Sequence, residues 1–178
     1  LDTLPIENIL FLDIETVPQK KEYGSLDEAF KKMWDTKVSS LQKSGRITET
    51  PDEYYRSAGI YAEFGKVICI SVGLINACLP KEGQGDGRQG KEFRIKSFSG
   101  DNETQLLSDF ASLLRSHYTK AEHLLCAHNG KEFDFPYLSR RMLVNGIQLP
   151  KILDTAGKKP WEVQHLDTME LWKFGDYK

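Results

Sequence analysis

The chain of 178 residues has no long apolar run that could cross a membrane. A membrane-spanning helix needs roughly 18 consecutive apolar residues, and no segment approaches that length. The first residues also lack the layout of a signal peptide. These absences predict a cytoplasmic protein with no membrane partner.

The sequence is also poor in cysteine and carries no strong excess of one charge. Its three cysteines, Cys69, Cys78 and Cys126, include no Cys-x-x-Cys pair. They are interpreted as buried thiols in a reducing compartment, which excludes a disulfide framework and a zinc site. The net charge of -2 excludes a basic nucleic-acid coat protein. Contact with phosphate must therefore come from local patches or from bound metal.

What is present is the composition of a globular protein, with 39% hydrophobic and 28% charged residues. A chain of this length can bury one sizeable core, and it is too short to argue for two. We therefore expect residues 1–178 to form a single domain.

The first strong pattern is an apolar segment that ends in two carboxylates. Residues 6–14 (IENILFLDI) are apolar on both alternating sets from Ile9 onward, which is typical of a central strand buried on both faces. Pro18 ends it. Asp13 and Glu15 leave the same face of this strand, where they repel each other unless a cation lies between them. The alternative is that one carboxylate caps a turn and the other is solvated.

Residues 19–65 are a charged insertion with two helix-start signals. Residues 25–28 (SLDE) predict a capping box, and Thr50, Pro51 and Glu53 predict a second helix start. Apolar residues at helical spacing predict one packed face, formed by Leu26, Phe30, Met33, Trp34 and Leu41. We expect a helical lid on the domain. The alternative is that the insertion grips a substrate strand through Lys31, Lys32, Lys37, Trp34, Tyr54 or Tyr55.

The rest of the chain predicts an α/β fold with a mixed sheet. Residues 67–75 predict a buried strand, residues 93–98 an edge strand and residues 124–127 a short fourth strand. Helices are predicted from Asn102 onward and over residues 133–144. Strand–helix–strand order in this half implies parallel pairing.

Residues 80–91 imitate a phosphate-binding loop at Gly85-x4-Gly90-Lys91. Glu92 follows where that motif needs a hydroxyl, and a strand follows where it needs a helix N-terminus. We therefore interpret this segment as a flexible hairpin loop.

A third carboxylate lies where the fourth strand gives way to its helix, within residues 127–136 (AHNGKEFDFP). Asp134 occupies the first helical turn, which the helix dipole favours by itself. Ligand sites in such sheets gather beyond the carboxyl ends of the strands. Together with Asp13 and Glu15, Asp134 supplies the oxygen ligands that a pair of divalent metal ions requires.

These motifs resemble a known family. Asp13-Ile14-Glu15-Thr16 followed by Asn129-x3-Phe133-Asp134 resembles the first two motifs of the DEDD 3′–5′ exonucleases, which have the ribonuclease H-like fold. The likeness is strongest to the exonuclease domain of family B DNA polymerases and to the bacterial exonucleases related to it. It implies a mixed five-stranded sheet flanked by helices, with the helical insertion after the first strand.

The resemblance also implies roles for individual residues. Asp13, Glu15 and Asp134 would be catalytic and would hold two Mg²⁺ or Mn²⁺ ions on the scissile phosphate. Four residues would bind substrate: Thr16 at the terminal nucleotide, Asn129 near the last phosphate, Phe133 beside the terminal base and Lys131 on phosphate. For Phe133 a place in the core is an open alternative, and for Lys131 so is solvation.

The family also has a third motif, Tyr-x3-Asp or His-x4-Asp, which no later carboxylate completes. His165 precedes Asp167 by only two residues, and Asp167 is interpreted as a helix N-cap boxed with Glu170. We expect the third motif to lie beyond Lys178, so that residues 1–178 are a C-terminally truncated fragment with weak or no activity.

We predict a metal-dependent 3′–5′ exonuclease that acts on single-stranded DNA 3′ ends, in repair or in proofreading. The alternatives are a catalytically impaired nucleic-acid-binding module of the same fold and a 3′–5′ exoribonuclease.

Overall fold

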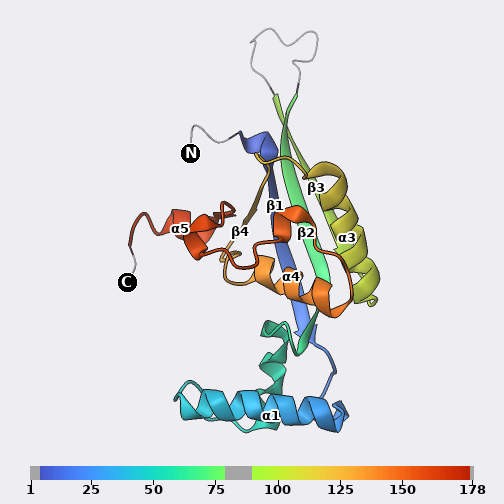
Figure 1. Ribbon diagram of the computed structural model, residues 1–178, viewed down its shortest axis with the longest axis vertical. Coiled ribbons are helices and arrows are strands. Elements are labelled where there is room, and N and C mark those ends of the chain that lie inside the picture. The colour runs from blue at the N-terminus through green and yellow to red at the C-terminus, as the bar shows by residue number, and fades with distance from the viewer. Residues whose placement is uncertain (1–4, 79–89, 177–178) are drawn as a thin grey trace.

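The computed structural model describes residues 5–78 and 90–176 (Figure 1). The segment that imitates a phosphate-binding loop falls largely within residues 79–89, so its interpretation lies outside the described residues. The same holds for the side chain of Cys78. Of the other two thiols, Cys126 is buried as predicted, whereas Cys69 is only half-buried. No helix in the described part of the chain is long and apolar enough to cross a membrane.

A five-stranded mixed sheet with the order β3-β2-β1-β4-β5 forms the centre of the molecule. The strands are β1 (Ile9–Pro18), β2 (Gly65–Cys78), β3 (Gly90–Ser99), β4 (Leu124–Ala127) and β5 (Leu166–Asp167). The β1–β2 and β2–β3 pairs are antiparallel, and the β1–β4 and β4–β5 pairs are parallel. This confirms the mixed sheet and the edge position of β3. The parallel pairs arise because α3 connects β3 to β4 and α4 follows β4 on the way to β5, so that β4 and β5 each enter the sheet after a crossover.

Strand β1 is central, but only one of its faces is buried along its full length. Leu12 and Ile14 are buried, whereas Asp13 and Glu15 are exposed on the opposite face. Burial on both faces was therefore wrong beyond Leu10. The predicted strand also began too early, because residues Ile6–Asn8 form a 3-10 helix.

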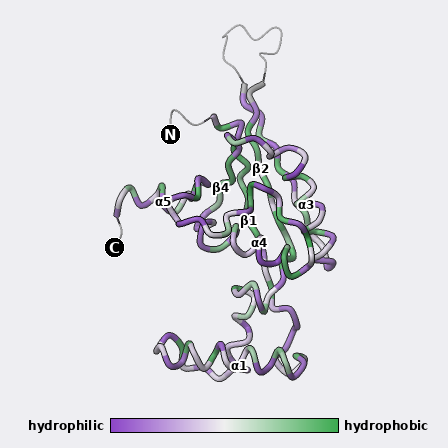
Figure 2. The backbone as a smooth tube through the Cα atoms, viewed as in Figure 1, coloured by the Kyte–Doolittle hydropathy of each residue, from purple (hydrophilic) through white to green (hydrophobic). Residues whose placement is uncertain are grey.

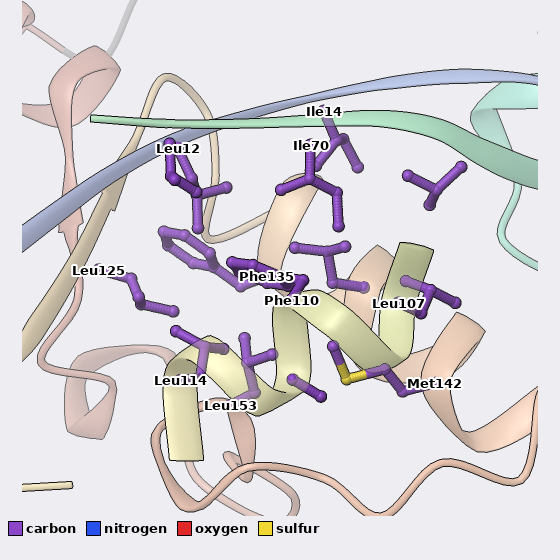
Figure 3. Packing of buried hydrophobic residues seen from close by; sticks show 14 of the residues in the cluster. Leu12, Ile14, Ile70, Leu107, Phe110, Leu114, Leu125, Phe135, Met142 and Leu153 are labelled. Atoms are coloured by element: carbon purple, nitrogen blue, oxygen red, sulfur yellow. The ribbon is translucent and has the colours of Figure 1, made fainter. Parts of the chain in front are cut away.

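Helices α3 (Glu103–His117) and α4 (Asp134–Val144) cover the buried face of the sheet. Their apolar stripes meet the inward side chains of β1 and β2 (Figure 3), and Phe110, Leu114, Leu138 and Met142 are fully buried. Asn102 caps α3 as predicted, with its side chain accepting from the Gln105 amide.

The insertion after β1 contains α1 (Glu28–Lys43) and α2 (Pro51–Tyr54), with 3-10 helices at Tyr23–Ser25 and Tyr55–Ile60. It lies beyond the end of β1 (Figure 1), and its helix α1 alternates polar and apolar residues (Figure 2). The capping box of Thr50 and Glu53 is confirmed. The first cap was misplaced, because Asp27 rather than Ser25 accepts from the Phe30 amide, at 2.8 Å.

The insertion has a small aromatic core of its own around Trp34. That ring is fully buried, stacks on Tyr54 at 5.9 Å and meets Tyr55 edge-on at 5.5 Å. Met33 is 49% exposed, so it is not part of the packed face; Val38 is buried there instead. Because Trp34 and Tyr55 are enclosed, neither can grip a substrate strand.

The insertion packs closely against α4 and the start of β2, where Gly59, Gly65 and Tyr137 meet. The Tyr137 hydroxyl of α4 donates to the Gly59 carbonyl at 2.7 Å, and burial raises the pKa of Tyr137 to about 12. A Cβ at Gly65 would collide with that hydroxyl and lie 2.7 Å from the Gly59 carbonyl oxygen, so only glycine fits there.

A buried ion pair between Arg141 and Glu103 joins α4 to α3. Arg141 Nε donates to Glu103 Oε1 at 2.9 Å and Nη1 donates to the Ala62 carbonyl at 3.0 Å, while the Val67 amide donates to Glu103 Oε1 at 2.8 Å. Burial acts to raise the pKa of Glu103, but these hydrogen bonds outweigh it and hold the pKa below its usual value.

We expect Arg141→Met to lower the free energy of unfolding by about 3–5 kcal/mol, because it leaves the Glu103 carboxylate buried and uncompensated. Chemical denaturation measures this. Arg56→Met is the control, since Arg56 and Glu49 form a surface pair with 78% and 35% of their side chains exposed. Its effect should stay below about 1 kcal/mol. Equal losses in the two variants would contradict the assignment.

Candidate nuclease site

The exposed face of β1 presents two carboxylates beside a polar strip of the sheet. Asp13 lies opposite Ser71 of β2, and Glu15 lies opposite Cys69. Ser71 in turn bonds the Ser97 hydroxyl of β3 at 2.9 Å. The pairing of β1 with β2 shifts register between Glu15 and Thr16, so an irregularity bends the strand next to these carboxylates.

Asp134 is the first residue of α4 and is only 3% exposed. The pairing of β4 with β1 ends at Phe11 and Cys126. Beyond that point the Ile14 amide of β1 donates to Asp134 Oδ1 at 3.2 Å. The carboxylate thus continues the hydrogen bonding of the β1 edge after β4 has turned away, and it ties α4 to the residue between Asp13 and Glu15.

The pKa of Asp134 is raised to about 6. Burial is the main cause, and the negative charges of Asp13 and Asp167 add to it, while hydrogen bonds from the backbone oppose it. A carboxyl group that is both desolvated and close to other carboxylates is destabilised when it ionises. Its environment favours either a proton or a cation.

The donor chemistry of this site fits a hard divalent cation. Such ions bind carboxylate oxygens, and Asp13 lies close enough for its charge to act on Asp134. Glu15 shares the exposed face with Asp13. Within residues 5–78 and 90–176, however, no three or more His, Cys, Asp or Glu side chains form a group that could hold a metal ion. The charge of Asp13 thus acts on Asp134, and the three predicted ligands are not assembled into one metal-binding group within the described residues.

The loop between β4 and α4 carries Asn129 in a left-handed conformation, with φ of 59°. The Phe133 amide donates to the Asn129 carbonyl at 3.0 Å, which closes the loop. Asn129 Oδ1 is a buried atom with no hydrogen-bond partner within the described residues. Because a buried polar atom without a partner is costly, Asn129 is suited to meeting a ligand donor.

Asp167 is the residue that sequence reasoning underestimated. It caps α5 (Thr168–Trp172) as predicted, with Oδ1 accepting from the Met169 amide at 2.9 Å. The same carboxylate also accepts from the Asn129 amide at 2.8 Å and from the Lys131 amide at 3.1 Å. It is 3% exposed. Because its carboxylate accepts hydrogen bonds from three backbone amides, Asp167 holds the loop in place. A local sequence pattern could not reveal this role, because Asn129 and Asp167 are 38 residues apart.

The predicted box between Asp167 and Glu170 is replaced by a different contact. Lys131 Nζ binds Glu170 Oε2 at 2.8 Å, and its side chain is 22% exposed. Lys131 is therefore neither fully solvated nor unpaired.

Phe133 and Thr16 both lie against Tyr137. The Phe133 ring is 5.3 Å from the Tyr137 ring and packs partly buried against the main core, in agreement with the core alternative. The Thr16 side chain contacts the Tyr137 hydroxyl. These contacts hold the end of β1 against the start of α4.

Neither nearby histidine has a metal-ligand arrangement. His165 is buried, donates from Nε2 to the Ile152 carbonyl at 2.8 Å and accepts from the Leu125 amide at 3.3 Å. Burial lowers its pKa, so it is a neutral structural residue. His128 is exposed and bonds the Thr168 hydroxyl at 3.0 Å.

The sheet order, the helices on one face, and the carboxylates within β1 and at the start of α4 define a ribonuclease H-like exonuclease fold, as predicted. The family of predicted 3′–5′ exonucleases related to the exonuclease domain of PolB matches residues 62–174, which is more than half of the chain. The chain belongs to this family.

The matched region contains Asn129, Asp134 and Asp167, whereas Asp13 and Glu15 precede it. No curated protein matches the chain significantly. A solved family B DNA polymerase from the hyperthermophilic archaeon Pyrobaculum calidifontis is 17% identical, with a TM-score of 0.37. That match covers 79% of this chain and 11% of the polymerase.

We expect Asp134→Asn to stabilise the metal-free protein at neutral pH. Because the folded-state pKa of Asp134 is raised from 3.8 to about 6, its contribution to stability is complete below the lower value and is lost as pH rises through the higher one. The variant should therefore gain up to about 3 kcal/mol over the native chain at pH 7 and little at low pH.

Denaturation in EDTA across this pH range measures the difference. The control is Asp109→Asn on α3, which replaces an exposed carboxylate by an amide in the same way. A native chain that keeps its stability relative to Asp134→Asn as pH rises would contradict the raised pKa.

We expect Asp167→Ala to loosen the Asn129 loop beyond the effect of losing a helix cap. Hydrogen exchange of the Asn129 and Lys131 amides should accelerate at least about tenfold, because both lose their acceptor. Asp27→Ala removes a comparable cap from α1 and should cost about 1 kcal/mol without changing exchange in this loop. Equal exchange in both variants would show that Asp167 is a cap only.

Proposed function

We propose that this chain is a metal-dependent 3′–5′ exonuclease that hydrolyses phosphodiester bonds at single-stranded DNA 3′ ends. The observation that supports it most is the buried carboxyl of Asp134. It is bonded to the strand that carries Asp13 and Glu15, and the charge of Asp13 acts on it. Membership of the exonuclease family supports the reaction class and a nucleic-acid substrate.

We propose that the site binds two ions of Mg²⁺ or Mn²⁺, held by Asp13, Glu15 and Asp134. Such ions generate a hydroxide from bound water near neutral pH and stabilise charge on a departing oxygen. The protein contributes position. Asp134 is held by the Ile14 amide, and Asp13 is the residue before Ile14, so this bond keeps the Asp134 carboxylate beside the strand that carries Asp13.

The surrounding residues suit the 3′ end of a strand. Asn129 would bond near the last phosphate through its side-chain NH2 group, which donates, whereas its buried Oδ1, which has no partner within the described residues, would accept from a donor group of the terminal nucleotide. Thr16, at the strand irregularity, would meet the terminal nucleotide. Phe133 would act mainly by packing behind Asp134, while Lys131 would have to leave Glu170 to touch phosphate.

A nucleic-acid-binding module without catalysis is the second candidate. One observation favours it: the described residues contain no assembled group of three metal-binding side chains. The two candidates differ in divalent-metal binding, which catalysis requires and simple strand binding does not.

We expect Asp13→Ala and Asp134→Ala to lower nucleotide release at least about a hundredfold and to weaken Mn²⁺ binding, because each removes a proposed ligand. Release is measured from the 3′ end of a labelled single strand with the natural full-length chain, and Mn²⁺ binding by calorimetry. Matched DNA and RNA strands separate a deoxyribonuclease from an exoribonuclease.

Asp109→Ala, which removes an exposed carboxylate on α3, should leave both measurements unchanged. Activity that survives Asp13→Ala would reject the proposed site. Strand binding without Mn²⁺ binding or nucleotide release would favour the binding module.

A further inference from the structure

A pocket of about 630 Å³ lies beside the candidate nuclease site, between the Asn129 loop and α5. Its lining includes Asn129, Lys131, Asp167 and Lys173, with Trp161 as one wall. In Figure 1, α5 lies to the left of β4 and α3 to the right of β3. None of the lining residues belongs to the main core, so this pocket is separate from it. Its volume falls in the range of roughly 300–1,000 Å³ that is usual for small-ligand sites.

The floor of the pocket is rigidly built. Asp167 accepts hydrogen bonds from the Asn129 and Lys131 amides on one side and from the Met169 amide on the other. These bonds fix the loop and the start of α5 relative to each other. Because this loop is already ordered, binding a ligand here costs less conformational entropy than binding to a flexible loop would.

The aromatic ring of Trp161 lines the same pocket. Its side chain is 76% exposed, although the 3-10 helix that carries it, Pro160–Glu162, is held by a bond of 2.7 Å from the Lys159 amide to Glu162 Oε2. Lys159 Nζ lies 5.2 Å from the centroid of the ring. An exposed aromatic ring on a fixed turn with a neighbouring cation is the combination on which the bases of single strands stack.

The charges around the pocket tolerate a polyanion. The pocket lining contains three carboxylates, Glu132, Asp167 and Glu170, and two lysines, Lys131 and Lys173. Asp167 is 3% exposed and turns both of its oxygens to backbone amides, and Glu170 is paired with Lys131 at 2.8 Å. Lys173, together with Lys159 beside the ring, opposes Glu132. A stacked base with its phosphates directed toward these lysines is compatible with this pattern.

We propose that Trp161 and the pocket beside it form a stacking subsite for a base of single-stranded DNA next to the 3′ end. This proposal rests on the proposed function, because it takes the bound strand to be DNA whose 3′ end lies in the nuclease site. Asn129 belongs both to that site and to the pocket. The subsite binds the strand and takes no part in the chemistry.

The test is the affinity of a fluorescein-labelled oligothymidylate of about ten nucleotides, measured by fluorescence anisotropy in EDTA so that no hydrolysis occurs. Trp161→Ala should weaken binding at least about fivefold, and Trp161→Phe should retain most of the affinity. The control is Trp172→Ala, because that residue is 81% exposed and is not part of the pocket lining. It should bind like the native chain.

Intrinsic fluorescence provides a second measurement on the same strand. Binding should quench the native chain and Trp172→Phe, but much less Trp161→Phe, because Trp34 is fully buried. Thermal unfolding of the variants checks that they fold, as expected for exposed positions.

Equal affinity of Trp161→Ala and the native chain, or no strand binding by the native chain, would overturn the subsite. Neither result affects the Mn²⁺ binding and nucleotide release that test the proposed function. If those fail while strand binding still depends on Trp161, the subsite stands without the nuclease.

Discussion

The arrangement of the site depends on one buried carboxyl. Asp134 begins α4 and accepts from the Ile14 amide at the point where β4 has left the edge of β1. This contact stabilises the sheet edge and anchors the helix, but it places a titratable group among other carboxylates at 3% exposure. The protein thus keeps a locally unfavourable charge in a well-ordered place. Such a conflict between stability and position is expected where a cation is to be bound.

A second carboxylate, that of Asp167, holds the loop that leads into the helix of Asp134. Asp167 lies at the end of β5 and holds the loop that leads from β4 into α4. It caps α5 as well, so three segments meet at one side chain. This explains how Asn129 is kept in a left-handed conformation, with its side-chain Oδ1 buried and without a hydrogen-bond partner in the described part of the chain. The pocket beside Trp161 has its floor in the same contact.

The fold was largely predictable because its signals are local. The signals for the edge position of β3, the Asn102 and Thr50 caps and the apolar stripe of α3 each lie within a few residues, and all were confirmed. Errors occurred where local signals compete. Ser25 and Asp27 are comparably good N-cap residues, so the sequence did not distinguish them, and in the structure Asp27 is the N-cap of α1. Met33 has helical spacing, yet the aromatic core around Trp34 closed without it.

By itself the sequence determined the segments that form the first four strands, the helices α3 and α4 and the shared face of Asp13 and Glu15, because backbone periodicity and caps set these. Only the tertiary structure decided that the charge of Asp13 acts on Asp134, that Trp34 and Tyr55 are enclosed, and that Asp167 braces a loop 38 residues away. Those outcomes depend on how separate segments pack against one another. No spacing along the chain encodes a contact whose two partners are brought together only by the crossover between parallel strands.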